Sequence, residues 1–173
     1  MKGNGAEGFE QVFEAHQAQV YRFALRLCGS REEAEDLAAE AFAAAFQNWD
    51  RFRGESSATT WLYGIVLNRW RMQWRRKRLR PERLEAAEAI AQTFQFQALE
   101  LAEALNALPD PLREAFLLVK GEGLSHAEAA KAVGAPVGTM YFRVHQAVRR
   151  LRASLAAEPF PVRSIEVTCE QEL

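Results

Sequence analysis

The sequence predicts an all-α protein built from two small helical domains, and three observations support this fold class. Apolar residues recur at steps of three and four along most of the chain, which is the period of a helix that buries one face. Serine, aspartate, glycine and proline residues stand where such helices would begin and end. No alternating strand pattern precedes the C-terminal tail, and its segment RSIEVT is too short and isolated to form a sheet.

The first domain is predicted over residues 9–80. An apolar stripe that begins at Phe9 marks a long first helix, which ends at Gly29. Ser30 and Glu33 have the spacing of a capping box, which predicts the start of a second helix. The inward-facing stripe of that second helix is Ala34, Leu37, Ala38, Ala41, Phe42, Ala45, Phe46 and Trp49.

A polar loop over residues 50–60 separates the second helix from a third, which runs to Arg80. This helix stops before Pro81, because proline does not continue a helix. Its first half, WLYGIVL, is apolar on all sides and should be buried. Its second half, RWRMQWRRKRLR, is too basic for a core, so we expect it to project positive charge together with Trp70 and Trp74.

The second domain is predicted over residues 98–155, after a linker over residues 81–97 that lacks a clean apolar stripe. Helical periodicity returns at Ala98. Asp110 is placed to cap a further helix whose first residue is Pro111. The domain therefore begins with helices and leads into a helical hairpin.

That hairpin, over residues 124–152, has the pattern of a helix-turn-helix. Ser125 and Glu128 form a second capping box at its start. Gly134 supplies the left-handed residue that ends the first helix, and Pro136 starts the second. The apolar stripe of the second helix is Val137, Met140, Val144, Val148, Leu151 and Leu155.

Basic and aromatic side chains fall largely on the outer face of this second helix, as contact with the DNA major groove requires. The alternative is a helical hairpin whose arginines are only solvated. The DNA-binding residues predicted for the hairpin are Ser125, Ala129, Gly134, Val137, Gly138, Thr139, Tyr141, Phe142, Arg143, His145, Gln146, Arg149 and Arg150.

Charge is segregated along the chain, although the net charge is only −1. Residues 61–80 carry seven basic side chains and no acidic one, whereas residues 32–40 carry five acidic side chains and no basic one. This asymmetry indicates that partners of opposite charge bind different faces of the protein. The tail over residues 156–173 is acidic and holds two prolines, which predicts disorder.

The third helix of the first domain suits single-stranded nucleic acid. Trp70 and Trp74 lie four residues apart and share a helical face, with Arg71 and Arg75 on the adjacent ridge. Arginine neutralises phosphates, and an exposed base can stack on an aromatic ring for about 1–3 kcal/mol. The alternative places both tryptophans in the core and leaves the arginines as a solvated end.

Composition excludes several classes of protein. A hydrophobic content of 49% and a charged content of 26% describe an ordinary soluble protein. We expect a cytoplasmic protein with no membrane insertion, because no apolar run reaches spanning length and MKGNGAEG lacks the apolar stretch of a signal peptide.

Cys28 and Cys169 lack metal-ligand spacing, so we expect reduced thiols, no metal and no cofactor. Without a nucleophile constellation or a phosphate loop, we expect no enzyme.

Three blocks, taken in order, resemble the extracytoplasmic-function branch of the bacterial RNA polymerase sigma-factor family. A family helix that docks on the clamp helices of the polymerase largest subunit is similar to AEDLAAEAF. The promoter-melting block is similar to FRGESSATTWLYGIVLNRWRMQWRRKR. The second DNA-binding domain is similar to LPDPLREAFLLVKGEGLSHAEAAKAVGAPVGTMYFRV, so the resemblance covers about residues 9–155 apart from the linker.

The resemblance implies three sets of contacts. Core polymerase would contact Glu35, Asp36, Leu37, Glu40, Phe42 and Phe46. The melted minus-ten strand would be held by Phe52, Arg53, Glu55, Ser56, Ser57, Asn68, Arg69, Trp70, Arg71, Trp74, Arg75 and Arg76, with an extruded base in a pocket near residues 52–57. The minus-thirty-five duplex would lie on the recognition helix, with base edges facing Arg143, His145 and Gln146.

The chain departs from the family pattern at the start of the recognition helix. Tyr141 and Phe142 stand where the family usually has lysine and serine. Two aromatic rings there favour contact with thymine methyls or sugars over a phosphate contact. Met72 and Ala39 likewise replace an acidic residue and a glutamine.

The resemblance implies the function of a sigma factor. Such a protein binds the clamp helices and the flap of core RNA polymerase, directs the polymerase to promoters and assists promoter opening. The implied partners are promoter DNA, as duplex and as melted strand, and an anti-sigma factor. One alternative is a stand-alone helix-turn-helix regulator with an N-terminal dimerisation or sensing domain. Another is a family member that acts as a decoy and does not initiate transcription. The all-round basic helix over residues 61–80 is a poor dimerisation surface, which favours the sigma factor.

Overall fold

The computed structural model describes residues 5–78 and 97–156, and every regular element within these ranges is a helix. The predicted all-α class is confirmed. The predicted linker and the predicted acidic tail lie outside the described residues, apart from Gln97 and Ala156 at their edges. Among the described residues, no helix combines the length and the apolar character that crossing a bilayer requires.

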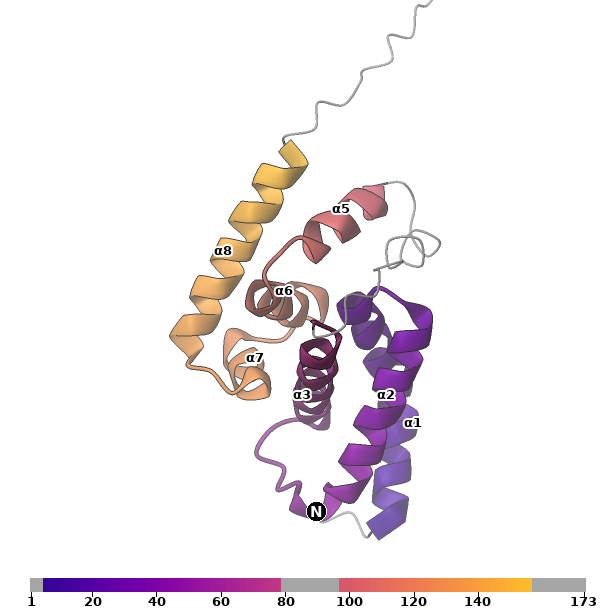
Figure 1. Ribbon diagram of the computed structural model, residues 1–173. Helices are drawn as coiled ribbons and strands as arrows, with labels where there is room; N and C mark the ends of the chain where they lie inside the picture. The colour runs from indigo at the N-terminus through magenta and orange to yellow at the C-terminus, as the bar shows by residue number, and fades with distance from the viewer. Residues whose placement is uncertain (1–4, 79–96, 157–173) are drawn as a thin grey trace, which may run out of the picture.

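Three helices make up the first domain (Figure 1). α1 (Gly5–Cys28) and α2 (Arg31–Gln47) lie side by side, because Gly29 reverses the chain between them at a φ of 75° that suits glycine. A short 3-10 turn, η1 (Trp49–Arg51), and a loop then lead to α3 (Ala58–Arg78), which packs against both helices.

The second domain contains α5 (Gln97–Asn106), α6 (Asp110–Phe116), α7 (His126–Val133) and α8 (Val137–Ala156). α6 continues into a π-helical turn, η2 (Leu117–Gly121). α8 packs against α5, α6 and α7, and the α7–α8 hairpin is the predicted helix-turn-helix. In Figure 1 α6 and α7 lie between α8 and α3, so the second domain faces the first through its shorter helices.

One continuous hydrophobic core joins the two domains. Phe23, Leu37 and Tyr63 from the first domain are fully buried, and so are Leu118 and Met140 from the second. All five side chains belong to the same cluster. Nothing in the periodicity of the sequence indicates this contact, because a helical stripe shows that a face is covered without showing which element covers it.

Two of the predicted helix-end signals are confirmed by the structure and one is wrong. The Ser125–Glu128 capping box is confirmed, since the Glu128 amide donates to Ser125 Oγ at 3.2 Å and the Ser125 amide donates to Glu128 Oε2 at 2.9 Å. Gly134 ends α7 at a φ of 72°, also as predicted. The Ser30–Glu33 box is wrong, because the Ser30 side chain makes no cap hydrogen bond.

The predicted cap of α6 is also displaced by one residue. Asp110 is the first residue of the helix, and Pro109 occupies the cap position. The carboxylate of Asp110 instead accepts a hydrogen bond from Arg113 Nη2 at 3.1 Å. This partner lies on the same helix, one turn further along.

The inward stripe of α8 is confirmed at its centre and wrong at its ends. Met140, Val144 and Leu151 are buried, as the periodicity predicted. Val137 remains 42% exposed and Leu155 39% exposed. These two residues lie at the first and last turns of α8, where fewer neighbouring helices reach the stripe.

Candidate nucleic-acid interface

The outer face of α8 is open to solvent at the positions predicted to contact DNA. Tyr141 is 58% exposed and Phe142 62% exposed. The Tyr141 ring stacks on His126 of α7, with ring centroids 3.9 Å apart and planes within 9°. This stack holds the tyrosine in a fixed orientation, so the two helices of the hairpin present one preformed surface.

The other predicted residues of the hairpin divide into contact positions and supports. His145, Arg149 and Arg150 are exposed, and Arg143, Gln146 and Thr139 are partly exposed. Gly138 and Val137 are exposed at the start of α8. Ala129 is fully buried, and its small side chain packs in the core, where it supports the hairpin. Ser125 and Gly134 shape the ends of α7.

Trp70 is buried in this structure, so its ring is not open to a base in this conformation. Its side chain is only 3% exposed and belongs to the hydrophobic core. The guanidinium carbon of Arg113, from α6, lies 5.0 Å from the centroid of the Trp70 ring. A cation from the second domain thus covers the ring face that the sequence assigned to DNA. The side chains of Trp74, Arg75 and Arg76 lie outside the described part of the structure.

Arg71 is engaged by a carboxylate, which corrects the expectation of a phosphate contact in this conformation. Its Nε donates to Glu114 Oε1 at 2.9 Å, and its Nη2 donates to the other carboxylate oxygen. These two hydrogen bonds, more than the opposing effect of burial, raise the pKa of Arg71. On the same helix Asn68 is exposed and Arg69 is partly exposed.

The loop before α3 is held in place by aromatic stacking. Phe52 stacks on Trp49 with ring centroids 5.4 Å apart, and its ring lies 4.9 Å from that of Trp61. Ser57 Oγ accepts from the Thr60 amide at 3.1 Å, which fixes the start of α3. Arg53, Glu55 and Ser57 are exposed around this anchor, and Ser56 is partly exposed.

An open cavity of about 230 Å³ lies between the loop, α3 and α7. It is lined by Ser56, Thr60, Trp61, Gly64, Ile65, Asn68, Lys131 and Ala132. The structure therefore brings together Ser56 and Asn68, two predicted strand-binding residues that are distant in sequence. Sequence reasoning missed Lys131 and Ala132, because α7 supplies them from the second domain.

The exposed face of α2 retains the charged residues predicted to bind polymerase and buries two apolar ones. Glu35, Asp36 and Glu40 are exposed. Leu37 is fully buried and Phe42 is 8% exposed, so both hold α2 in the core in this structure, and their contact with polymerase stays a prediction. Phe46 is 55% exposed, with its ring edge-on to Phe9 at 5.2 Å. These polar and aromatic side chains remain accessible to a partner.

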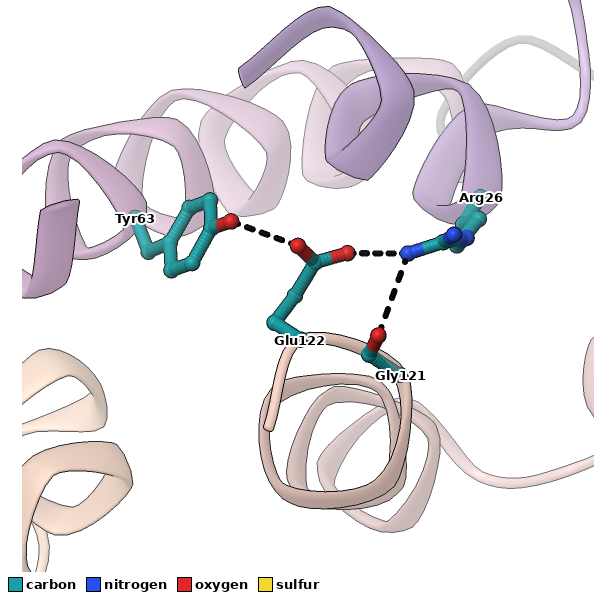
Figure 2. A network of polar contacts seen from close by, with 4 residues as sticks. All are labelled: Arg26, Tyr63, Gly121 and Glu122. Carbon is teal, nitrogen blue, oxygen red and sulfur yellow. Dashed lines mark hydrogen bonds and ion pairs between the residues drawn. The ribbon is translucent and has the colours of Figure 1, made fainter. Parts of the chain in front are cut away.

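Glu122 forms a second polar link between the domains (Figure 2). One of its carboxylate oxygens accepts from the Tyr63 hydroxyl at 2.5 Å, and the other pairs with Arg26 of α1. Arg26 also donates to the Gly121 carbonyl at 3.5 Å. Burial first, and the bond to Glu122 second, raise the pKa of Tyr63, so its hydroxyl stays protonated as a donor.

Comparison with known proteins identifies the family. The family model Sigma-70 region 2 matches residues 12–80, and the model Sigma-70, region 4 matches residues 98–151. The ECF RNA polymerase sigma factor EcfG of Rhodopseudomonas palustris (strain TIE-1) is 34% identical over 139 residues, covering 77% of each chain. This chain belongs to the extracytoplasmic-function (ECF) sigma factors.

Further relatives agree with this assignment. The ECF sigma factor SigC of Mycobacterium tuberculosis (strain CDC 1551 / Oshkosh) is 37% identical over 166 residues, covering 91% of this chain and 87% of SigC. The sigma factor RpoE of Bartonella quintana, solved in complex with the anti-sigma factor NepR, matches with a TM-score of 0.73 and 25% identity. That match covers 89% of this chain and 100% of RpoE.

A second solved structure, CnrH in complex with the cytosolic domain of CnrY, matches with a TM-score of 0.70 and 25% identity, covering 90% of this sigma factor and 92% of CnrH. The predicted sigma-factor function is confirmed over that of a stand-alone regulator. The protein works with core RNA polymerase and promoter DNA in transcription initiation.

Proposed function

We propose a division of tasks among the surfaces of this sigma factor. The outer face of α8 reads the minus-thirty-five duplex, the loop and cavity beside α3 hold the melted minus-ten strand, and the exposed face of α2 binds core polymerase. The observation that supports this division best is the preformed α7–α8 surface, where Tyr141 and Phe142 are both more than half exposed beside Arg149 and Arg150. A flat aromatic and basic surface of this kind fits a groove and its phosphates.

The remaining assignments follow from the family. We propose domain bounds of residues 9–80 and 98–155, which the matches to residues 12–80 and 98–151 support. The protein acts in the cytoplasm, where polymerase works, and it is no enzyme, because polymerisation chemistry belongs to the polymerase. An anti-sigma factor is a further partner, by analogy with the RpoE–NepR complex.

Replacing Phe142 by alanine is expected to weaken binding to the duplex promoter. The exposed ring can cover the methyl group of a thymine, and covering one such group contributes about 0.8 kcal/mol, which is roughly a fourfold change in the dissociation constant. The promoter would be identified by genome-wide mapping, and affinity measured by fluorescence anisotropy on that duplex and on one with deoxyuridine in place of thymine.

If the Phe142 ring contacts the thymine methyl group, the effects of Phe142→Ala and of deoxyuridine on the free energy of binding should not be additive. Deoxyuridine should weaken the wild type and leave the Phe142→Ala variant unaffected. Ser154→Ala, exposed at the far end of α8, serves as the control and should bind both duplexes as the wild type does. Equal losses on both duplexes would show that Phe142 does not contact a thymine methyl.

Replacing Asp36 and Glu40 together by alanine is expected to weaken binding to core polymerase. Both carboxylates are exposed on α2, and removing two charges from a complementary interface should raise the dissociation constant about tenfold, or about 1.4 kcal/mol. Titration of labelled sigma factor with purified core measures this effect, which should shrink at high salt. Glu14→Ala, which removes an exposed charge from α1, should bind core normally. Unchanged affinity in the double variant would refute the α2 docking surface.

A further inference from the structure

His126, the first residue of α7, has a well-defined backbone position although it lies at a helix end. The capping box encloses it, because the Glu128 amide donates to Ser125 Oγ at 3.2 Å and the Ser125 amide donates to Glu128 Oε2 at 2.9 Å. Both backbone donors at this end thus have partners, which restrains the first turn. The imidazole of His126 therefore leaves α7 from a fixed point.

Tyr141 has an equally fixed backbone on α8. The preceding residue, Met140, is fully buried, and its amide donates to the Pro136 carbonyl at 3.3 Å. Gly134 ends α7 with a φ of 72° and thereby sets the turn between the two helices (Figure 1). Across this turn the phenol ring stacks on His126, and the packing of α7 against α8 keeps the two rings in register.

The stack restrains a side chain that is otherwise largely open to solvent. Tyr141 is 58% exposed, so little besides the imidazole limits its rotamers. A mobile side chain must be ordered when it enters an interface, and this ordering weakens binding. Because His126 orders the phenol in the free protein, Tyr141 meets DNA already in place.

Glu128 disfavours the alternative that the His126 imidazole itself contacts a DNA phosphate. The hydroxyl of Ser125 donates to Glu128 Oε2 at 2.7 Å. This bond first, and the bond from the Ser125 amide second, lower the pKa of Glu128, so its carboxylate stays negative. A negative charge at the start of α7 repels a phosphate there. The contact with DNA is therefore assigned to the stacked tyrosine.

We propose that His126 is a positioning residue for promoter recognition and acts through Tyr141. It holds the phenol so that the open part of the ring and the hydroxyl meet a base edge of the minus-thirty-five duplex in one orientation. Sequence discrimination then depends on His126, although the imidazole touches no base. The inference rests on the proposed role of α8 in reading this duplex.

The first test compares His126→Ala with His126→Phe by fluorescence anisotropy on the mapped promoter duplex. Alanine frees Tyr141 and should weaken binding about fivefold, the cost of ordering one such side chain. Phenylalanine keeps a flat ring for stacking and should restore the wild-type affinity. Binding to a random-sequence duplex should not change in either variant. His16→Ala, which removes a partly exposed imidazole from α1, is the matched control and should bind both duplexes normally.

A double-mutant cycle tests whether His126 acts through Tyr141. Tyr141→Ala should weaken promoter binding at least as much as His126→Ala does. Adding His126→Ala to Tyr141→Ala should then cause no further loss, because the ring that His126 positions is already absent.

Proton magnetic resonance detects the stack itself, without DNA. The chain has only three histidines, so the His126 resonances are identified by their loss in His126→Phe. The ring current of Tyr141 should shift the His126 ring protons upfield, and Tyr141→Ala should remove this shift. Promoter duplex should leave the shift in place, since the stack persists in the complex. An unshifted His126 in the wild type overturns the inference.

Two binding results also overturn the inference. One is a His126→Phe variant that binds the promoter as weakly as His126→Ala, because the imidazole itself would then make the contact. The other is an equal loss on promoter and random duplex. Arg149→Ala with Arg150→Ala should weaken binding to both duplexes, because both arginines are exposed on α8. Unchanged binding of that variant would instead contradict the proposed role of α8, whereas the resonance measurement does not depend on DNA.

Discussion

Replacing Trp70 by alanine is expected to lower the free energy of unfolding by about 3–5 kcal/mol. The ring is 3% exposed, lies in the main hydrophobic core and carries the Arg113 guanidinium on one face. Removing it leaves a large cavity and also deprives a buried cation of its aromatic neighbour. Urea denaturation followed by far-ultraviolet circular dichroism would measure the loss.

Trp70→Phe gives the matched comparison for this variant. Phenylalanine keeps an apolar ring in the same space, so a smaller loss of stability is expected than with alanine. If Trp70→Ala unfolds at nearly the same urea concentration as the wild type, the ring does not contribute to the core. Specific loss of single-strand binding in a fully stable variant would then favour the stacking role predicted from the sequence.

Replacing Leu37 by alanine is expected to lower the free energy of unfolding by about 2–5 kcal/mol. Leu37 is fully buried where α2 packs into the core, although the family resemblance assigned it to polymerase binding. The same denaturation experiment measures the change, and titration with core polymerase measures any effect on binding at a temperature where the variant remains folded.

Phe46→Ala is the matched comparison for Leu37→Ala, because Phe46 lies on the same helix. Phe46 is 55% exposed, so its loss should change stability little while weakening binding to core polymerase. A stable Leu37→Ala variant with reduced polymerase affinity would contradict the burial of Leu37 in the working protein. Together, the two variants distinguish a residue that holds α2 in the core from a residue of α2 that contacts polymerase.

Local signals explain where the sequence-based predictions succeeded. The Ser125–Glu128 capping box and the left-handed Gly134 need only residues within one or two turns, and both were predicted correctly. The stripe of α2 placed Leu37 and Phe42 inward, also correctly. The resemblance then assigned the same two residues to a partner, because a family motif marks positions without separating packing from contact.

Predictions failed where the deciding neighbour is distant in the chain. The sequence around Trp70 is basic, which predicted an exposed ring, yet its cover comes from Arg113 on α6. Arg71 has no acidic neighbour on its own helix, and Glu114 on α6 supplies one. No pattern along α3 could have indicated either partner.

The sequence by itself determined that the chain is all-α, that it carries a helix-turn-helix with an exposed aromatic and basic face, and that it belongs with sigma factors. Periodicity, capping residues and motifs suffice for these properties, since each depends on contacts within a helix or across one turn. Only the tertiary structure decided that Trp70 and Arg71 are covered and that Glu114 and Glu122 join the domains. Burial and ion pairing depend on which surfaces meet in space, and here Gly64 allows the backbones of two helices far apart in sequence to approach closely.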